Sequence, residues 1–100
     1  MTEKGKSIID HINSNRKNYI TALNKMESGM KITFAIRSRN NAHGIPERQV
    51  LSIYRTQMKD KQYFAGFLTE EGVPIEGCGK WFTNPETALK HIQHLASTSL

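Results

Sequence analysis

The sequence has little of several features that would narrow its function. Its 100 residues contain a single cysteine, Cys78, so the chain cannot form an internal disulfide, and we expect a reducing, cytoplasmic setting. No apolar run approaches the roughly 20 residues of a membrane-spanning helix, and none follows the first lysines as in a signal peptide. We therefore expect no membrane partner. The length predicts a single domain over residues 1–100.

Motifs for catalysis, metal binding and cofactor binding are also missing. His91 and His94 stand three residues apart and follow Cys78, but zinc needs four ligands in a tetrahedral arrangement. No metal site is predicted, and both histidines are expected to be exposed. Residues 77–80 lack the length and the following Ser or Thr of a phosphate loop. We predict a non-enzymatic protein without a cofactor, with a small ribonuclease as the remaining enzymatic alternative.

The N-terminal segment, residues 1–29, has helical periodicity. Its apolar residues recur at three- and four-residue spacing, although Arg16 interrupts the stripe. The polar run at residues 13–15 favours helix ends over helix interiors. The segment is therefore either two helices with a joint at Ser14 or one long helix with a weak middle, and Gly29 is a plausible stop.

The C-terminal segment, residues 84–97, predicts a helix with a clear beginning. Thr83 or Asn84 can cap it, Pro85 suits its first turn, and Glu86 is placed as in a capping box. The apolar residues that follow lie on one face of this helix.

Between the helices, the sequence alternates between apolar and polar residues. From residue 30 to 37, the apolar residues should point toward the core and the residues between them outward. The inward set is Met30, Ile32, Phe34 and Ile36, and the outward set is Lys31, Thr33, Ala35 and Arg37. Residues 38–48 are predicted as a loop, residues 49–58 and 63–69 as strands joined by a turn at 59–62, and residues 73–82 as a possible fourth strand, in which Gly77 and Gly79 indicate a bulge or a close approach.

These elements predict an α+β fold. The order is α-β-β-β-(β)-α: an N-terminal helical segment (1–29), an antiparallel β-meander of three or four strands (30–82) and a C-terminal helix (84–97). Both helical segments are expected to pack on one face of the sheet, since each has one apolar face to bury.

The charge is uneven along the chain. The net charge is +5, from 14 basic and 9 acidic residues. Six basic residues fall between positions 37 and 61, where arginine and lysine side chains would contact phosphates. They are Arg37, Arg39, Arg48, Arg55, Lys59 and Lys61. The leading hypothesis is therefore a small basic accessory or regulatory protein that binds DNA or RNA.

Each of four aromatic residues allows two interpretations, one functional and one structural. Tyr54 and Tyr63 would offer stacking faces for bases if they pointed outward, but core positions are favoured for both. Trp81 and Phe82 could anchor a partner, but we expect them to pack the last helix onto the sheet.

The alternative function belongs to a different class. A compact domain without an active site can act as an inhibitor or adaptor by covering a partner protein's surface. The exposed edge of the strand at 30–37 would be a docking line or a homodimer contact. The positions of the basic residues distinguish the nucleic-acid hypothesis from the protein-partner hypothesis. One contiguous basic face favours nucleic acid, and scattered basic residues with an exposed apolar patch favour a protein partner.

Two parts of the sequence resemble known nucleic-acid-binding domains. The order of elements over about residues 45–96, with Gly77-Cys78-Gly79 before the last helix, resembles double-stranded RNA-binding domains and implies RNA as a partner. The lysines that this family carries at the start of its last helix are replaced here by residues 85–89, PETAL, so the RNA contacts do not carry over. Residues 80–88 are similar to the strand-to-helix join of the three-stranded DNA-binding domains of phage-type integrases.

Overall fold

A computed structural model describes residues 1–57, 62–75 and 77–100 of the chain. The predicted turn at 59–62 therefore lies mostly outside the described residues, as do Lys59 and Lys61. The described elements follow in the order α1 (Glu3–Ser14), α2 (Arg16–Lys25), β1 (Lys31–Asn40), β2 (Pro46–Arg55), β3 (Tyr63–Thr69), β4 (Lys80–Phe82) and α3 (Pro85–Ser99).

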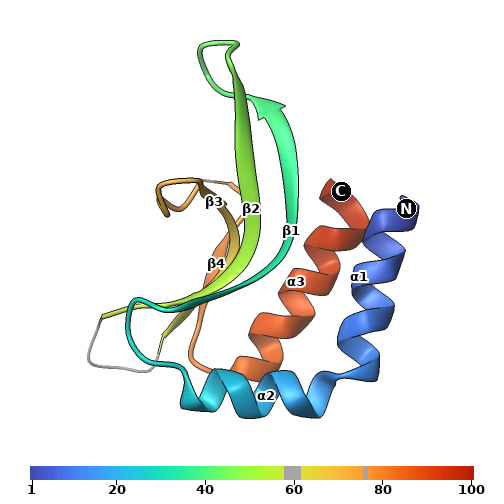
Figure 1. The fold of residues 1–100 in the computed structure, drawn as a ribbon, viewed down its shortest axis with the longest axis vertical. Helices are drawn as coiled ribbons and strands as arrows, with labels where there is room; N and C mark the ends of the chain where they lie inside the picture. Colours follow the sequence, from blue (N-terminus) through green and yellow to red (C-terminus); the bar gives the residue numbers. More distant parts are fainter. Residues whose placement is uncertain (58–61, 76) are drawn as a thin grey trace.

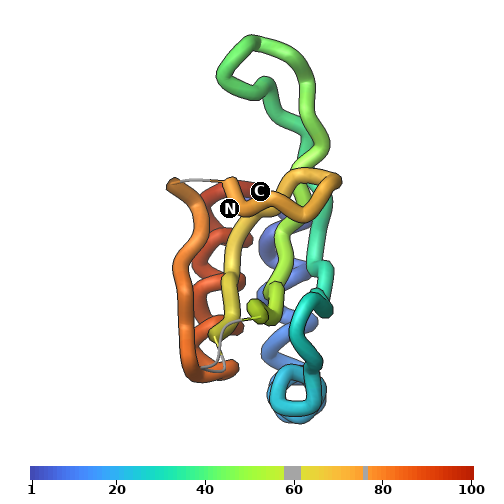
Figure 2. The backbone as a smooth tube through the Cα atoms, turned by 90° about the vertical axis from the view of Figure 1, so that its left-hand side faces the viewer, coloured from blue at the N-terminus to red at the C-terminus, as the bar shows by residue number. Residues whose placement is uncertain are grey.

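The strands form one antiparallel sheet in the order β1-β2-β3-β4, and the helices lie on one of its faces (Figures 1 and 2). Apolar side chains of β2 and β3, among them Leu51, Ile53 and Phe67, pack in the core with Leu89 and Ile92 of α3. The predicted α+β architecture is confirmed. The face of the sheet turned away from the helices, called the outer face below, has no helix over it in the described chain.

The N-terminal segment forms two helices joined at Asn15. Arg16, which interrupts the apolar stripe in the sequence, explains the joint. Its guanidinium donates to Gln93 Oε1 of α3 at 2.7 Å and to Asn13 Oδ1 at 3.2 Å, so a polar contact replaces the apolar one. Helix α2 ends at Lys25. Gly29, which was a plausible helix stop in the sequence, has a φ of +88° and lies in the turn that leads into β1.

Helix α3 begins as predicted. The Asn84 side chain accepts a hydrogen bond from the Glu86 backbone N–H at 2.8 Å, and Pro85 occupies the first turn. Helix α3 runs antiparallel to α1, and the two chain ends lie side by side (Figure 1).

Gly5 marks the closest approach of α1 to α3, and we expect Gly5→Ala to destabilise the protein. A Cβ at this position would overlap the backbone carbonyl oxygen of Ala96, and a backbone atom in a packed helix cannot move aside freely. Overpacking of this kind costs about 1–3 kcal/mol, more than the gain of up to about 1 kcal/mol in helix propensity. The melting temperature should fall by about 5 °C.

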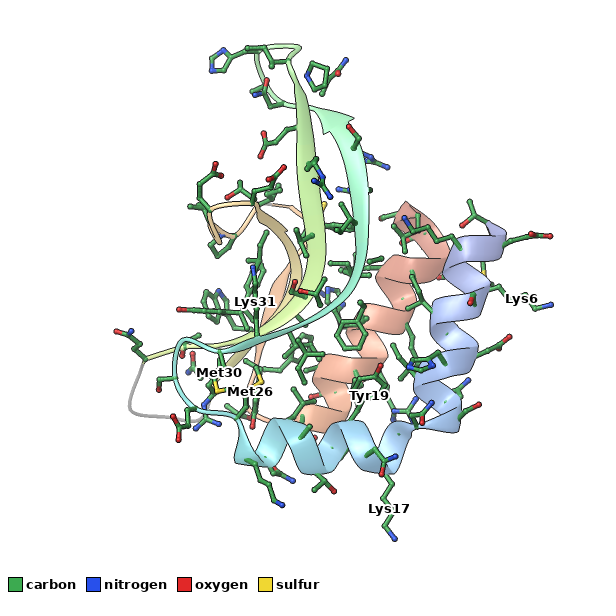
Figure 3. The ribbon with its side chains drawn as sticks, viewed as in Figure 1. Lys6, Lys17, Tyr19, Met26, Met30 and Lys31 are labelled. Carbon is green, nitrogen blue, oxygen red and sulfur yellow. The ribbon has the colours of Figure 1, made fainter. Side chains whose placement is uncertain are left out.

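Thermal unfolding followed by circular dichroism measures this effect. Lys6→Ala is the matched control, because Lys6 is exposed on the same helix and points into solvent (Figure 3). An unchanged or raised melting temperature for Gly5→Ala would contradict the packing of α1 on α3.

Strand β1 differs from the predicted alternation because it contains a β-bulge. The register passes from Thr33 opposite Ser52 to Ala35 opposite Leu51, which leaves Phe34 as the extra residue. An extra residue reverses the facing of everything after it. Ala35 is consequently buried in the core, while Ile36 lies on the outer face with 40% of its surface exposed. The predicted inward position of Ile36 and the predicted outward positions of Ala35 and Arg37 are therefore wrong. Met30, also expected to point toward the core, is 53% exposed just before the strand.

The predicted loop at residues 38–48 is also wrong, since most of it is paired strand. Ser38 lies opposite Arg48 and Asn40 opposite Pro46, so that only residues 41–45 connect the strands. This hairpin arm, residues 38–48, extends beyond the ends of α1 and α3 (Figure 1). The fourth strand exists but is limited to Lys80–Phe82.

Candidate functional site: the outer face of the sheet

Two of the six predicted phosphate contacts point into the protein. The Arg37 guanidinium lies 3.5 Å from the centroid of the Phe67 ring and donates to Gln49 Oε1 at 2.8 Å and to the Ser99 carbonyl oxygen at 3.0 Å. Burial lowers the pKa of Arg37 from its usual value. Since its donors are used to hold β1, β2 and α3 together, Arg37 is a structural residue.

Arg55 is internal in the same way. Its Nη1 atom donates to the Met26 carbonyl oxygen at 3.0 Å and to Tyr63 Oη at 3.3 Å. Tyr63 in turn donates to the Leu23 carbonyl oxygen at 2.8 Å. This network fixes the end of α2 against β2 and β3, so Arg55 also serves the fold.

The other two described residues of the predicted set are exposed but separated. Arg39 and Arg48 lie on opposite faces of the hairpin arm, because they belong to adjacent cross-strand pairs and side chains alternate along each strand. Arg48 lies 3.7 Å from Glu70. The four described residues of the set therefore form no contiguous basic face.

A different group of side chains comes together on the outer face. Lys31 lies opposite Tyr54, Tyr54 opposite Phe64, and Phe64 opposite Trp81. These four residues, called the aromatic row, cross all four strands, and in Figure 2 the sheet is seen from this side with the helices behind it. The row brings the exposed side chains of Lys31 and Trp81 and the half-buried ring of Tyr54 onto a face without a covering helix, with the buried ring of Phe64 between Tyr54 and Trp81.

Trp81 is the most exposed aromatic side chain of the row. Half of its surface (53%) is exposed, and its ring meets the edge of Phe64 at 5.1 Å between centroids. The prediction that Trp81 packs the last helix onto the sheet is wrong, because its ring lies against Phe64 on the outer face, while its neighbour Phe82 meets His91 of α3. One residue of offset along a strand decides which face a side chain occupies.

The tyrosines divide between the two faces of the sheet. Tyr63 is buried on the helix side, as expected, whereas Tyr54 is half-buried on the outer face. Tyr54 therefore points outward, which is the orientation in which its ring was expected to offer a stacking surface for bases.

Two glycines let the chain before β4 pack over the outer face at Gly66, next to Phe64 of the aromatic row. Gly66 and Gly79 come so close that a Cβ at Gly66 would meet the Gly79 Cα at 2.5 Å, and a Cβ at Gly79 would overlap the ring of Phe64. The predicted close approach at Gly79 is confirmed. Phe64 is thereby held against the backbone, with 4% of its surface exposed, and provides a firm base for Trp81.

His91 and Cys78 pack near the core, whereas His94 does not. His91 is half-buried, contrary to the expected exposure, while His94 is exposed. Burial lowers the pKa of His91 from its usual value, and Cys78 packs at the edge of the core. In the described residues no three His, Cys, Asp or Glu side chains are grouped as a metal site would require.

Comparisons with known proteins return nothing for this chain: no family model, no curated protein and no solved structure matches it. Among the described residues, no helix is both long and apolar enough to cross a membrane.

Proposed function

We propose that this protein is a non-enzymatic binding module that covers part of a partner protein with the outer face of its sheet. The observation that carries the proposal is the aromatic row, with Trp81 exposed at its end on a face that no described helix covers. Tyr54 and the exposed Ile36 add contact surface, and Lys31 and Arg48 lie toward its rim.

The chemistry of the row fits a protein interface. Tryptophan and tyrosine contribute most of the binding energy at protein interfaces, where a rigid aromatic ring fills a pocket of the partner and little side-chain entropy is lost. Trp81 is held from one side by Phe64 and free on the other, which is the state of a preorganised anchor. The scattered arginines agree with this reading, since they provide no phosphate-binding face.

The edge of β1, considered above as a docking line or dimer contact, is a weaker candidate than the face. Lys4 Nζ donates to the backbone carbonyl oxygen of Ile36 at 2.6 Å. Lysine at a sheet edge discourages pairing with another strand, and an added strand would have to displace this contact.

A single-stranded nucleic acid is the second candidate, and the same aromatic row favours it. Bases stack on exposed aromatic rings of sheet surfaces, and lysines beside them contact the phosphates. Lys31 at one end of the row and Lys80 beside Trp81 are both exposed. In this case the contacts would be Lys31, Tyr54 and Trp81 instead of the arginines that the sequence pattern favoured.

Affinity capture from host-cell lysate, with and without nuclease treatment, separates the two candidates. We expect one protein in stoichiometric amount to survive nuclease and to be lost when the bait carries Trp81→Ala. A bait with Ile45→Ala, which removes an equally exposed apolar side chain from the tip of the hairpin arm, should retain it. Recovery of nucleic acid alone would reject the protein partner and support the second candidate.

A further inference from the structure

A small hollow lies between α1, α2 and β1, on the helix side of the sheet. Its volume is about 290 Å³. Tyr19 reaches it from the side of α2 that faces the sheet (Figure 3), and Phe34 reaches it as the extra residue of the β-bulge in β1. The other lining residues are Ser7, Ile8, His11 and Thr33. The helix joint at Asn15 and the bulge thus bring two aromatic side chains to one space.

These two rings form one wall of the hollow. The Tyr19 ring lies 5.3 Å from the Phe34 ring and 5.8 Å from the His11 ring, between centroids. Tyr19 and Phe34 are both half-buried, so part of each ring stays accessible to a ligand. Burial raises the pKa of the Tyr19 hydroxyl, which keeps this wall uncharged. A flat ring can pack on such a wall, either stacked or edge to face.

The charged groups nearest the hollow are basic. His11 lines it and presents a ring N–H donor in either protonation state. Lys4 precedes Ile8 by four residues and His11 by seven, so it shares their face of α1. The acidic residues of this helix, Glu3 and Asp10, project roughly a quarter turn from the centre of that face. The six lining residues include no carboxylate.

Lys4 is held beside β1 by a hydrogen bond of its own. Its Nζ atom donates to the backbone carbonyl oxygen of Ile36 at 2.6 Å. Ile36 follows Phe34 by two residues, so the ammonium group stands roughly 7 Å further along the strand than Phe34. An ammonium group has three N–H donors, and this contact uses one of them. A ring packed on Tyr19 and Phe34 would have this cation within reach of a short side arm.

The hydroxyl groups do not set the chemistry of the ligand. Thr33 Oγ1 lies 3.5 Å from Ser52 Oγ on the outer face, and Ser7 is exposed to solvent. The distinctive pairing is an aromatic wall beside a positioned cation. It suits an anion attached to a flat ring, since a carboxylate accepts charge-assisted hydrogen bonds from an ammonium group. A volume near the lower end of the roughly 300–1,000 Å³ of small-molecule sites admits a single ring.

We propose that the hollow binds a small aromatic carboxylate, in which one ring carries its carboxylate on a short aliphatic arm. The ring packs against Tyr19 and Phe34, with the His11 ring at its edge. The carboxylate accepts a hydrogen bond from Nζ of Lys4. This site is independent of the proposed partner-binding function, because none of its residues belongs to the aromatic row.

Titration of the intact, ¹⁵N-labelled protein with phenylacetate tests the proposal, and phenylacetamide is the uncharged counterpart of this probe. Phenylacetate should cause saturable amide shifts at His11, Tyr19 and Phe34, with a dissociation constant of about 1 mM or lower. Phenylacetamide should bind about 10-fold more weakly, because it lacks the charge-assisted hydrogen bond to Lys4.

A lysine substitution identifies the group that receives the carboxylate. Lys4→Met should weaken phenylacetate binding by the same factor of about 10 and leave phenylacetamide binding unchanged. Lys4 is exposed, so this variant should fold. Lys6→Met is the matched control, since it removes the same charge from a position of α1 that points into solvent (Figure 3), and it should leave both affinities unchanged.

The absence of saturable shifts with phenylacetate would overturn the proposal. Shifts centred on Trp81 would also overturn it, since they would place the ring on the outer face. Equal affinity for phenylacetate and phenylacetamide would show that the hollow does not select an anion. Equal losses for Lys4→Met and Lys6→Met would show a general attraction to a basic protein instead of a contact with Lys4.

Discussion

Replacing Trp81 with alanine should lower affinity for the partner protein at least 30-fold. The expectation follows from the value of a central aromatic anchor, about 2 kcal/mol or more at protein interfaces, and from the position of Trp81 at the exposed end of the aromatic row. The loss should appear mainly as faster dissociation, because anchor residues act after encounter. Titration calorimetry with the captured partner measures it.

The fold should survive this substitution, which makes the binding loss interpretable. Trp81 is 53% exposed and contacts the ring of Phe64, so the melting temperature should change little. Ile45→Ala is the matched control, since Ile45 is 59% exposed at the tip of the hairpin arm, and it should alter affinity less than 2-fold, or about 0.4 kcal/mol. Equal losses for the two variants would mean that Trp81 is not the anchor.

Arg37→Ala should destabilise the protein by about 2–3 kcal/mol, even though arginine is usually a surface residue. The change removes hydrogen bonds to Gln49 and to the Ser99 carbonyl oxygen, together with the contact on Phe67. Hydrogen bonds to charged groups contribute about 1.5–3 kcal/mol, and the cation–π contact adds about 1 kcal/mol. The melting temperature should fall by about 10 °C.

Arg39→Ala is the control for this prediction. Arg39 lies two residues further along β1, has the same charge and is exposed on the hairpin arm, so its removal should change stability by less than about 0.5 kcal/mol. Chemical denaturation of both variants provides the comparison. Equal stability of the two would refute the structural role assigned to Arg37.

The sequence was sufficient for features that depend on local chemistry. The start of α3 was predictable because Asn84 and Pro85 act through their own side chains on the adjacent turn. The helix break near Asn15 was foreseeable from the polar run around it. The α+β order followed from periodicity, which is a property of consecutive residues.

Features that depend on cross-strand register were not predictable. The bulge at Phe34 leaves no mark in the spacing of β1, yet it reverses the facing of Ile36 and Arg37. Residues 38–48 look like a loop by composition, but Ser38 and Arg39 are ordered by their pairing with β2. In each case the deciding interaction comes from a residue far away in the sequence.

The candidate site was missed for the same reason. Lys31, Tyr54 and Trp81 are separated by more than twenty residues at each step, and only the register of three strand pairs makes them neighbours. The clustering of basic residues along the sequence favoured the arginines as the binding site. Two of them, Arg37 and Arg55, instead make hydrogen bonds within the fold. The exposure of Trp81, beside the half-buried Phe82, could not be predicted without knowing which face of the sheet each side chain occupies.

Site-specific photo-crosslinking in the host cell tests the central claim most directly. A photoreactive phenylalanine derivative would replace Trp81 on the outer face, and in a second variant His94, which is exposed on α3. We expect one discrete, nuclease-resistant protein adduct from position 81 and none from position 94. An adduct from position 94 alone, an adduct containing only nucleic acid, or no adduct from position 81 would contradict it.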